Sequence, residues 1–162
     1  HEESDNPAPA LLAQLSSDIG PRGSVVVWSA SFEKGCNELM GQLWPEHAEF
    51  LEQLNARVVD LMDPFMRGWY ADCNFYGSAS IKKVLPVLAP ELSYKELGIQ
   101  EGASAQRRWM QTVLGGASDG KPQLMSELRE YCALDTLAMV KIYQYLQSLG
   151  KGTGTKEQLS LF

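Results

Sequence analysis

The sequence predicts an α/β protein that is rich in helices and has only two or three recognisable strands. Two apolar, β-branched runs, "GSVVVWSAS" at 23–31 and "RVVDLM" at 57–62, do not alternate with polar residues, so we expect strands buried on both faces. Apolar residues at helical spacing fill most of the remaining chain, in the segments 8–20, 31–43, 45–56, 79–89, 103–115 and 122–148. Since two strands rarely form a stable sheet, we expect the other strands to lie outside this chain.

The composition is that of one globular domain, since 44% of the 162 residues are hydrophobic and 21% are charged. No apolar run is long enough to span a bilayer and no signal peptide opens the chain, so we expect a cytoplasmic protein. Cys36, Cys73 and Cys132 are odd in number and far apart, which favours reduced thiols. With only His1 and His47 and no C-x-x-C, a zinc site is not expected.

An aspartate interrupts the apolar stripe of the last predicted helix. We expect the inward positions to be Leu124, Leu128, Tyr131, Asp135, Ala138, Ile142, Tyr145 and Leu149. A buried carboxylate is costly unless it is paired, protonated or bound to a metal. Asp135 is therefore either satisfied by an arginine, a hydroxyl or a backbone amide, or it binds a metal beside Tyr131, one turn earlier.

A second carboxylate, Glu33, follows the first predicted strand at the start of a helix. Ligands of open α/β sheets gather at this edge of the sheet, which favours a functional role. An acidic residue in a first helical turn is also stabilised by the helix dipole, by about 0.3–1 kcal/mol. The local pattern leaves both interpretations open.

Two segments resemble motifs of the DEDD exonucleases, the DnaQ-like branch of the RNase H-like superfamily. "VVWSASFEKG" resembles the second motif, and "YCALD" resembles the third motif in its Tyr-x-x-x-Asp form. The chain is also similar, from about residue 5 to 149, to a bacterial family of uncharacterised proteins assigned to this superfamily, some of which carry a RecB-like nuclease region. This likeness runs through "VVDLMDPF", "GSASIKKVLPVLAPELSY", "LGIQEGASA" and "LREYCALDTLAMV".

The resemblance implies a three-layer RNase H-like fold and a metal-dependent 3′–5′ exonuclease, a hydrolase of DNA repair or processing. Glu33 and Asp135 would bind Mg²⁺ or Mn²⁺, and Tyr131 would orient or deprotonate the attacking water. The chain departs from the motif in having Ser29 for asparagine and Glu33 for aspartate, and the glutamate presents its carboxylate one methylene further from the backbone.

The first motif of these exonucleases, a strand with Asp-x-Glu, has no counterpart before residue 24. We therefore expect residues 1–149 to be a truncated domain that starts after three strands and is inactive alone, because two carboxylates cannot hold two cations. The sheet edge left bare would favour a homodimer or strand exchange. The alternative function is a non-catalytic module that binds nucleic acid or a sliding clamp.

Two further features point to partners. Lys82, Lys83, Arg107 and Arg108 are basic pairs near aromatic residues in the sequence, a composition that suits single-stranded DNA. The alternative is that the aromatic side chains pack in the core and the basic ones are solvated. The tail, residues 150–162, ends in "QLSLF", and Gln158, Leu159, Leu161 and Phe162 resemble the peptide that docks on the bacterial sliding clamp. The alternative is a tail that packs on its own domain or a chance match. Asp60 and Asp63 are expected to be structural.

Overall fold

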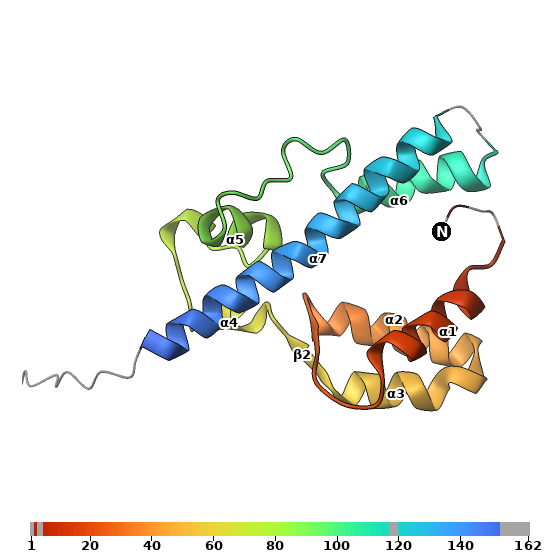
Figure 1. The fold of residues 1–162 in the computed structure, drawn as a ribbon, viewed down its shortest axis with the longest axis horizontal. Coiled ribbons are helices and arrows are strands. Elements are labelled where there is room, and N and C mark those ends of the chain that lie inside the picture. Colours follow the sequence, from red (N-terminus) through yellow and green to blue (C-terminus); the bar gives the residue numbers. More distant parts are fainter. Residues whose placement is uncertain (1, 3–4, 117–119, 153–162) are drawn as a thin grey trace, which may run out of the picture.

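A computed structural model describes residues 2, 5–116 and 120–152 of the chain (Figure 1). The coarse prediction of a helix-rich α/β protein is confirmed. The helices are α1 Ala8–Ile19, α2 Ala30–Leu43, α3 Ala48–Ala56, α4 Asp63–Met66, α5 Ile81–Leu88, α6 Gly102–Trp109 and α7 Lys121–Gly152. Short helical turns lie at η1 Pro45–His47, η2 Cys73–Phe75 and η3 Met110–Leu114. None of the described helices is both long and apolar enough to cross a membrane.

The sheet consists of two parallel strands, β1 Val25–Val27 and β2 Val58–Asp60. Val26 pairs with Val59, and the two side chains are 37% and 49% exposed. On the other face, Val25, Val27 and Val58 are only half-buried. The prediction of strands buried on both faces is therefore wrong, because one face of the sheet is exposed and the other is only partly covered.

The core is organised along α7, which crosses the whole molecule in Figure 1 with α1, α2 and α3 on one side and α5 on the other. One apolar cluster joins the second half of α7 to α5 and to the segment around α4 and η2. A smaller cluster joins the start of α7 to α6 and η3. Tyr131 packs against both clusters.

The predicted stripe of α7 is largely confirmed. Leu124, Ala138 and Ile142 are buried, and Leu128, Tyr131, Asp135 and Tyr145 are half-buried. Leu149 is 43% exposed, so its assignment to the core is wrong. The core clusters do not extend to this last turn of the helix, which continues to Gly152, beyond the expected end at residue 148.

Candidate functional site

The connection from β1 to α2 positions Glu33. The strand ends at Val27, Ser29 takes up a left-handed conformation with φ of 72°, and α2 begins at Ala30. This sharp turn places Glu33 in the first turn of the helix, as the sequence predicts. The Ser29 side chain does not cap the helix, so the free backbone N–H groups need another acceptor.

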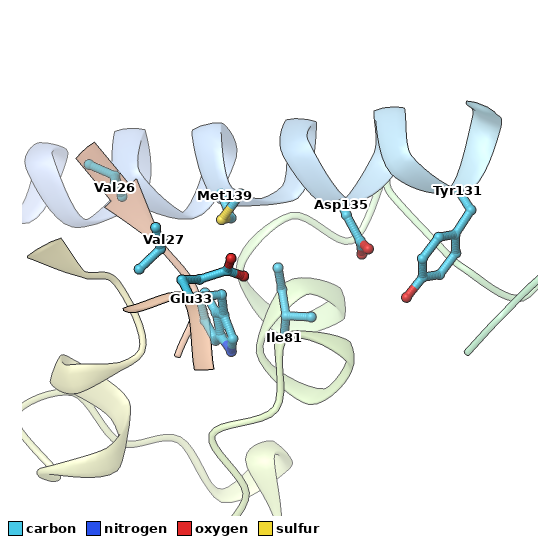
Figure 2. Close-up of a pocket in the computed structure, with 8 residues that line it drawn as sticks. Val26, Val27, Glu33, Ile81, Tyr131, Asp135 and Met139 are labelled. Atoms are coloured by element: carbon cyan, nitrogen blue, oxygen red, sulfur yellow. The ribbon is translucent and has the colours of Figure 1, made fainter. Parts of the chain in front are cut away.

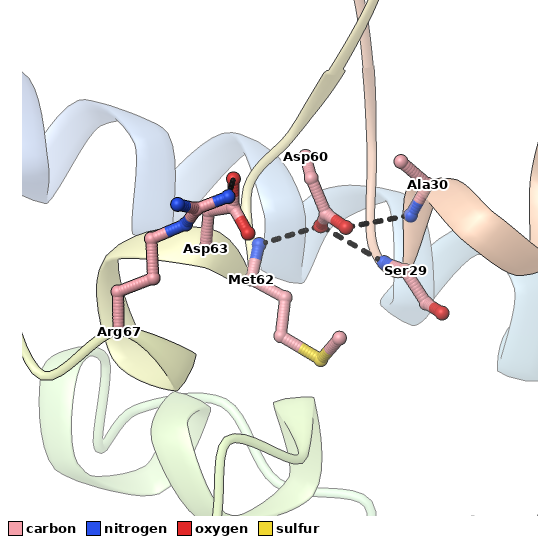
Figure 3. A network of polar contacts seen from close by, with 6 residues as sticks. All are labelled: Ser29, Ala30, Asp60, Met62, Asp63 and Arg67. Atoms are coloured by element: carbon pink, nitrogen blue, oxygen red, sulfur yellow. Dashed lines mark hydrogen bonds and ion pairs between the residues drawn. The ribbon is translucent and has the colours of Figure 1, made fainter.

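Asp60, the last residue of β2, is this acceptor (Figure 3). Its carboxylate accepts hydrogen bonds from the backbone N–H groups of Ser29 at 3.1 Å and Ala30 at 2.7 Å. A third bond comes from the N–H of Met62 at 2.9 Å. The parallel pairing of β1 and β2 thus brings a cap to the helix that carries Glu33.

The prediction that Asp60 is structural is confirmed, and its cross-strand capping role is new. Asp63, at the start of α4, forms an exposed ion pair with Arg67 at 3.3 Å, also a structural contact.

Asp135 is held in place by Tyr94, a residue that the sequence did not indicate as part of the site. The Tyr94 hydroxyl donates a hydrogen bond of 2.6 Å to Oδ1 of Asp135. Burial of the Tyr94 phenol, and then this hydrogen bond, raise its pKa well above the ordinary value, so it is a donor at neutral pH. The interpretation of Asp135 as an acid satisfied by a hydroxyl is therefore correct for one of its two oxygens.

Glu33, Tyr131 and Asp135 line a single cavity of about 390 Å³ (Figure 2). Asp135, Tyr131 and Met139 point from α7 toward the space that Glu33 enters from the opposite side. The other lining residues are Val26, Val27, Trp28 and Ile81. The residues that resemble the second and third exonuclease motifs therefore line one cavity, although they are far apart in the chain.

The electrostatics of the cavity follow from its partial burial. Loss of hydration raises the pKa of Glu33. Burial and then the charge of Asp135 raise the pKa of Tyr131 to about 12, so its phenol keeps the proton at neutral pH. The indole N–H of Trp28 is buried and has no hydrogen-bond partner among the described residues.

The donor set fits one hard divalent cation better than two. Two carboxylates with several waters are an ordinary environment for Mg²⁺, which is commonly held by one or two acidic side chains. No group of three or more His, Cys, Asp or Glu side chains suited to a metal occurs in the part of the chain that the structure describes. Two bridged cations would need further carboxylates.

Two of the four predicted basic residues, Lys82 and Arg108, make contacts within the chain. The Lys82 ammonium lies 5.7 Å from the Tyr94 ring and 5.8 Å from the Tyr131 ring, and donates a hydrogen bond to the carbonyl of Gln100. Arg108 is bound to Glu127 at 2.7 Å. Lys82 and Arg108 are therefore held by contacts with other residues of the same chain.

The other two basic residues, Lys83 and Arg107, are exposed. Of the nearby aromatic residues, Tyr70, Phe75 and Trp109 pack into the core clusters. The clamp-like residues Gln158, Leu159, Leu161 and Phe162 lie outside the residues that the structure describes.

Tyr94 and Trp28 are the site residues that sequence reasoning missed. Tyr94 lies in an irregular segment and meets Asp135 across 41 positions of sequence, so no local spacing indicates the contact. Trp28 follows β1 directly, at the edge of the sheet where ligands of α/β proteins bind. This position could have predicted Trp28 as a residue of the site.

Comparison with known proteins identifies related sequences whose functions are not described. Residues 1–80 match a family described as a domain of unknown function, DUF2779. The uncharacterized protein MG366 of Mycoplasma genitalium is 31% identical over 140 residues, which cover 79% of this chain and 21% of that protein. Its homolog in Mycoplasma pneumoniae is 31% identical over 140 residues, covering 76% of this chain and 20% of the homolog.

The chain thus spans about a fifth of the length of these curated relatives. No solved structure matches the chain at a significant level.

Proposed function

We propose that this chain forms part of a DEDD-type, RNase H-like exonuclease domain that cleaves phosphodiester bonds in a bacterial DNA-processing protein. The observation that supports the proposal is the shared cavity of Glu33, Tyr131 and Asp135. Two segments that resemble separate motifs contribute their acidic residues to the same space. If Glu33 and Asp135 had only structural roles, nothing would require their side chains to line the same cavity.

In this proposal, Glu33 and Asp135 hold a Mg²⁺ or Mn²⁺ ion. Tyr94, which donates a hydrogen bond to Oδ1 of Asp135, would hold this carboxylate in place beside the ion. A bound divalent cation would polarise the phosphate and favour deprotonation of a water. The polar residues of the cavity orient the substrate and the water around it.

Tyr131 orients or deprotonates the water in this scheme. In the metal-free chain its pKa of about 12 keeps the phenol protonated at pH 7, so its hydroxyl can donate a hydrogen bond to the water. Deprotonation of the water by Tyr131 would depend on the bound cation, which would offset the Asp135 charge that helps to raise this pKa.

Metal binding tests the proposal directly. We expect calorimetric titration with Mn²⁺ to show one weak site that is lost in Glu33→Gln and in Asp135→Asn. Asp63→Asn is the matched control, because it removes the same charge from an exposed ion pair outside the cavity. Mn²⁺ binding that is unchanged in both cavity variants would refute the proposed site.

Hydrolysis is a separate question from metal binding. The described residues supply two carboxylates to the cavity, so we propose that two-metal catalysis would need acidic residues from sequence outside these 162 residues. The chain alone is then expected not to degrade single-stranded DNA with Mg²⁺ or Mn²⁺. Robust degradation that Asp135→Asn abolishes would contradict this expectation.

The second candidate is a non-catalytic module that binds nucleic acid or a sliding clamp, which the resemblance of the C-terminal residues to a clamp-binding peptide favours. For the clamp-like tail, we propose that a peptide of residues 156–162 binds a bacterial sliding clamp. Leu161→Ala and Phe162→Ala should abolish the binding, and equal binding by both variant peptides would remove the proposal.

A further inference from the structure

The segment between β2 and α5 is built on buried aromatic side chains. We call residues 63–80 the aromatic loop. The Phe65 ring is its centre, with ring centroids 5.9 Å from Tyr70 and 5.8 Å from Phe75. The Tyr70 and Tyr145 hydroxyls are hydrogen-bonded at 2.8 Å, which attaches the loop to α7. These contacts fix an otherwise irregular segment against the core.

Two other aromatic residues of the loop face the solvent. Trp69 is 71% exposed and Tyr76 is 81% exposed, and each is next in sequence to a ring that packs into the core. Left-handed backbone at Gly68 and at Tyr76 itself, with φ of 69° and 52°, forms the sharp turns around them. A fixed loop thus presents two rings outward, although burial would remove far more of their apolar surface from water.

Each exposed ring has its own cation. The Arg67 guanidinium lies over the Trp69 ring, 5.4 Å from its centre, and also forms the exposed ion pair with Asp63 at 3.3 Å. The Lys83 ammonium lies over the Tyr76 ring, 5.8 Å from its centre. A base can stack on the ring face opposite each cation, and a phosphate that binds Arg67 would compete with Asp63.

We propose that the aromatic loop binds single-stranded nucleic acid, with bases stacked on Trp69 and Tyr76 and phosphates bound by Arg67 and Lys83. The choice of partner rests on the proposed nuclease function. The loop is also joined to the proposed metal site, because Phe65 stacks at 5.7 Å on Trp28, which lines the cavity of Glu33 and Asp135. The core of the loop and the wall of the cavity are therefore in direct contact through these two rings.

The charge of the chain limits how this binding would work. The formal net charge is −6, so long-range attraction for a polyanion is absent and the interaction depends on stacking. Two phosphate contacts predict a shallow salt dependence, with a log–log slope of about −1.4 for a single strand. Duplex DNA, whose bases are not available to the rings, should bind much more weakly.

Fluorescence anisotropy of a labelled 12-nucleotide oligothymidine, in EDTA and low salt, tests the proposal with the whole chain. Trp69→Ala and Tyr76→Ala should each weaken binding by about five- to 150-fold, the range measured for loss of one base stack. Trp69→Phe and Tyr76→Phe retain a ring and should recover most of the affinity. Leu114→Ala is the control, because it truncates an exposed apolar side chain outside the loop.

Substitutions that remove the positive charge of Arg67 or Lys83 test the proposed phosphate contacts. Arg67→Gln and Lys83→Gln should each reduce the salt slope by about 0.7, the value for one phosphate on a single strand. Arg107→Gln makes the same change of charge at an exposed site outside the loop and should leave the slope unchanged.

Three results would overturn the proposal: no binding by the wild-type chain, equal binding by the Trp69→Ala/Tyr76→Ala double variant, and duplex binding as tight as single-strand binding. Because EDTA removes divalent metal, none of them depends on the metal site. Conversely, Trp69→Ala should bind Mn²⁺ as the wild type does. A failure of the metal site and a failure of the loop are therefore distinguishable.

Discussion

Removing the Asp60 carboxylate should destabilise the fold and disorder the turn that carries Glu33. Asp60→Ala leaves three backbone N–H groups, those of Ser29, Ala30 and Met62, without their acceptor. A hydrogen bond to a charged group contributes about 1.5–3 kcal/mol, but the site is only half-buried and water replaces part of the loss. We therefore expect the free energy of unfolding to fall by about 3 kcal/mol, with Asp60→Asn intermediate because one acceptor oxygen remains.

Urea unfolding followed by circular dichroism measures this effect, and Asp63→Ala is the matched control. Asp63 lies three residues further on and makes an exposed ion pair, so its removal should change the free energy of unfolding by less than about 1 kcal/mol. If Asp60→Ala costs no more than Asp63→Ala, the capping argument is wrong. Since α2 begins at this cap, Asp60→Ala should also weaken Mn²⁺ binding, whereas Asp63→Ala should not.

Three further substitutions probe the same site. Ser29→Gly should stabilise the fold by about 0.4–1 kcal/mol in urea unfolding, because Ser29 has φ of 72° and its side chain makes no cap; destabilisation would refute this. Glu33→Gln should stabilise the fold at pH 7: the raised folded-state pKa of Glu33 means that ionisation costs stability as the pH rises. The gain should vanish below about pH 4, and a gain that is the same at pH 7 and pH 4 would refute this explanation. Tyr94→Phe should cost about 1.5 kcal/mol in urea unfolding and weaken Mn²⁺ binding, because Asp135 loses its donor; unchanged values would exclude a positioning role.

Local pattern was sufficient where the signal lies within one element. The position of Glu33 after a strand and the place of Asp135 in an apolar stripe both follow from spacing along the chain. Side chains that hold the site from other elements could not be predicted. Asp60 reaches α2 across 30 or 31 positions and Tyr94 reaches Asp135 across 41, and each contact depends on the packing of the whole fold.

The exposure of one face of the sheet could likewise not be predicted from the local sequence pattern. The run of valines in β1 indicates an apolar environment on both faces, and pattern alone cannot tell which face this chain covers. Aromatic residues of the loop were equally ambiguous, since Tyr70 and Phe75 pack inward while their sequence neighbours Trp69 and Tyr76 point to solvent. The sequence shows that aromatic residues are concentrated in the aromatic loop, but the turns of the backbone determine which of them are exposed.

These contacts make Trp28 the structural link between the two proposed sites. Its ring stacks on Phe65, the centre of the aromatic loop, and it also lines the cavity of Glu33 and Asp135. Its indole N–H is buried without a partner among the described residues, an arrangement that costs stability. A shift of the Trp28 ring would therefore be felt on both sides, by the stacking on Phe65 and by the wall of the cavity. In the two proposals together, the loop holds bases on Trp69 and Tyr76, and a cation held by Glu33 and Asp135 would bind a phosphate in the cavity.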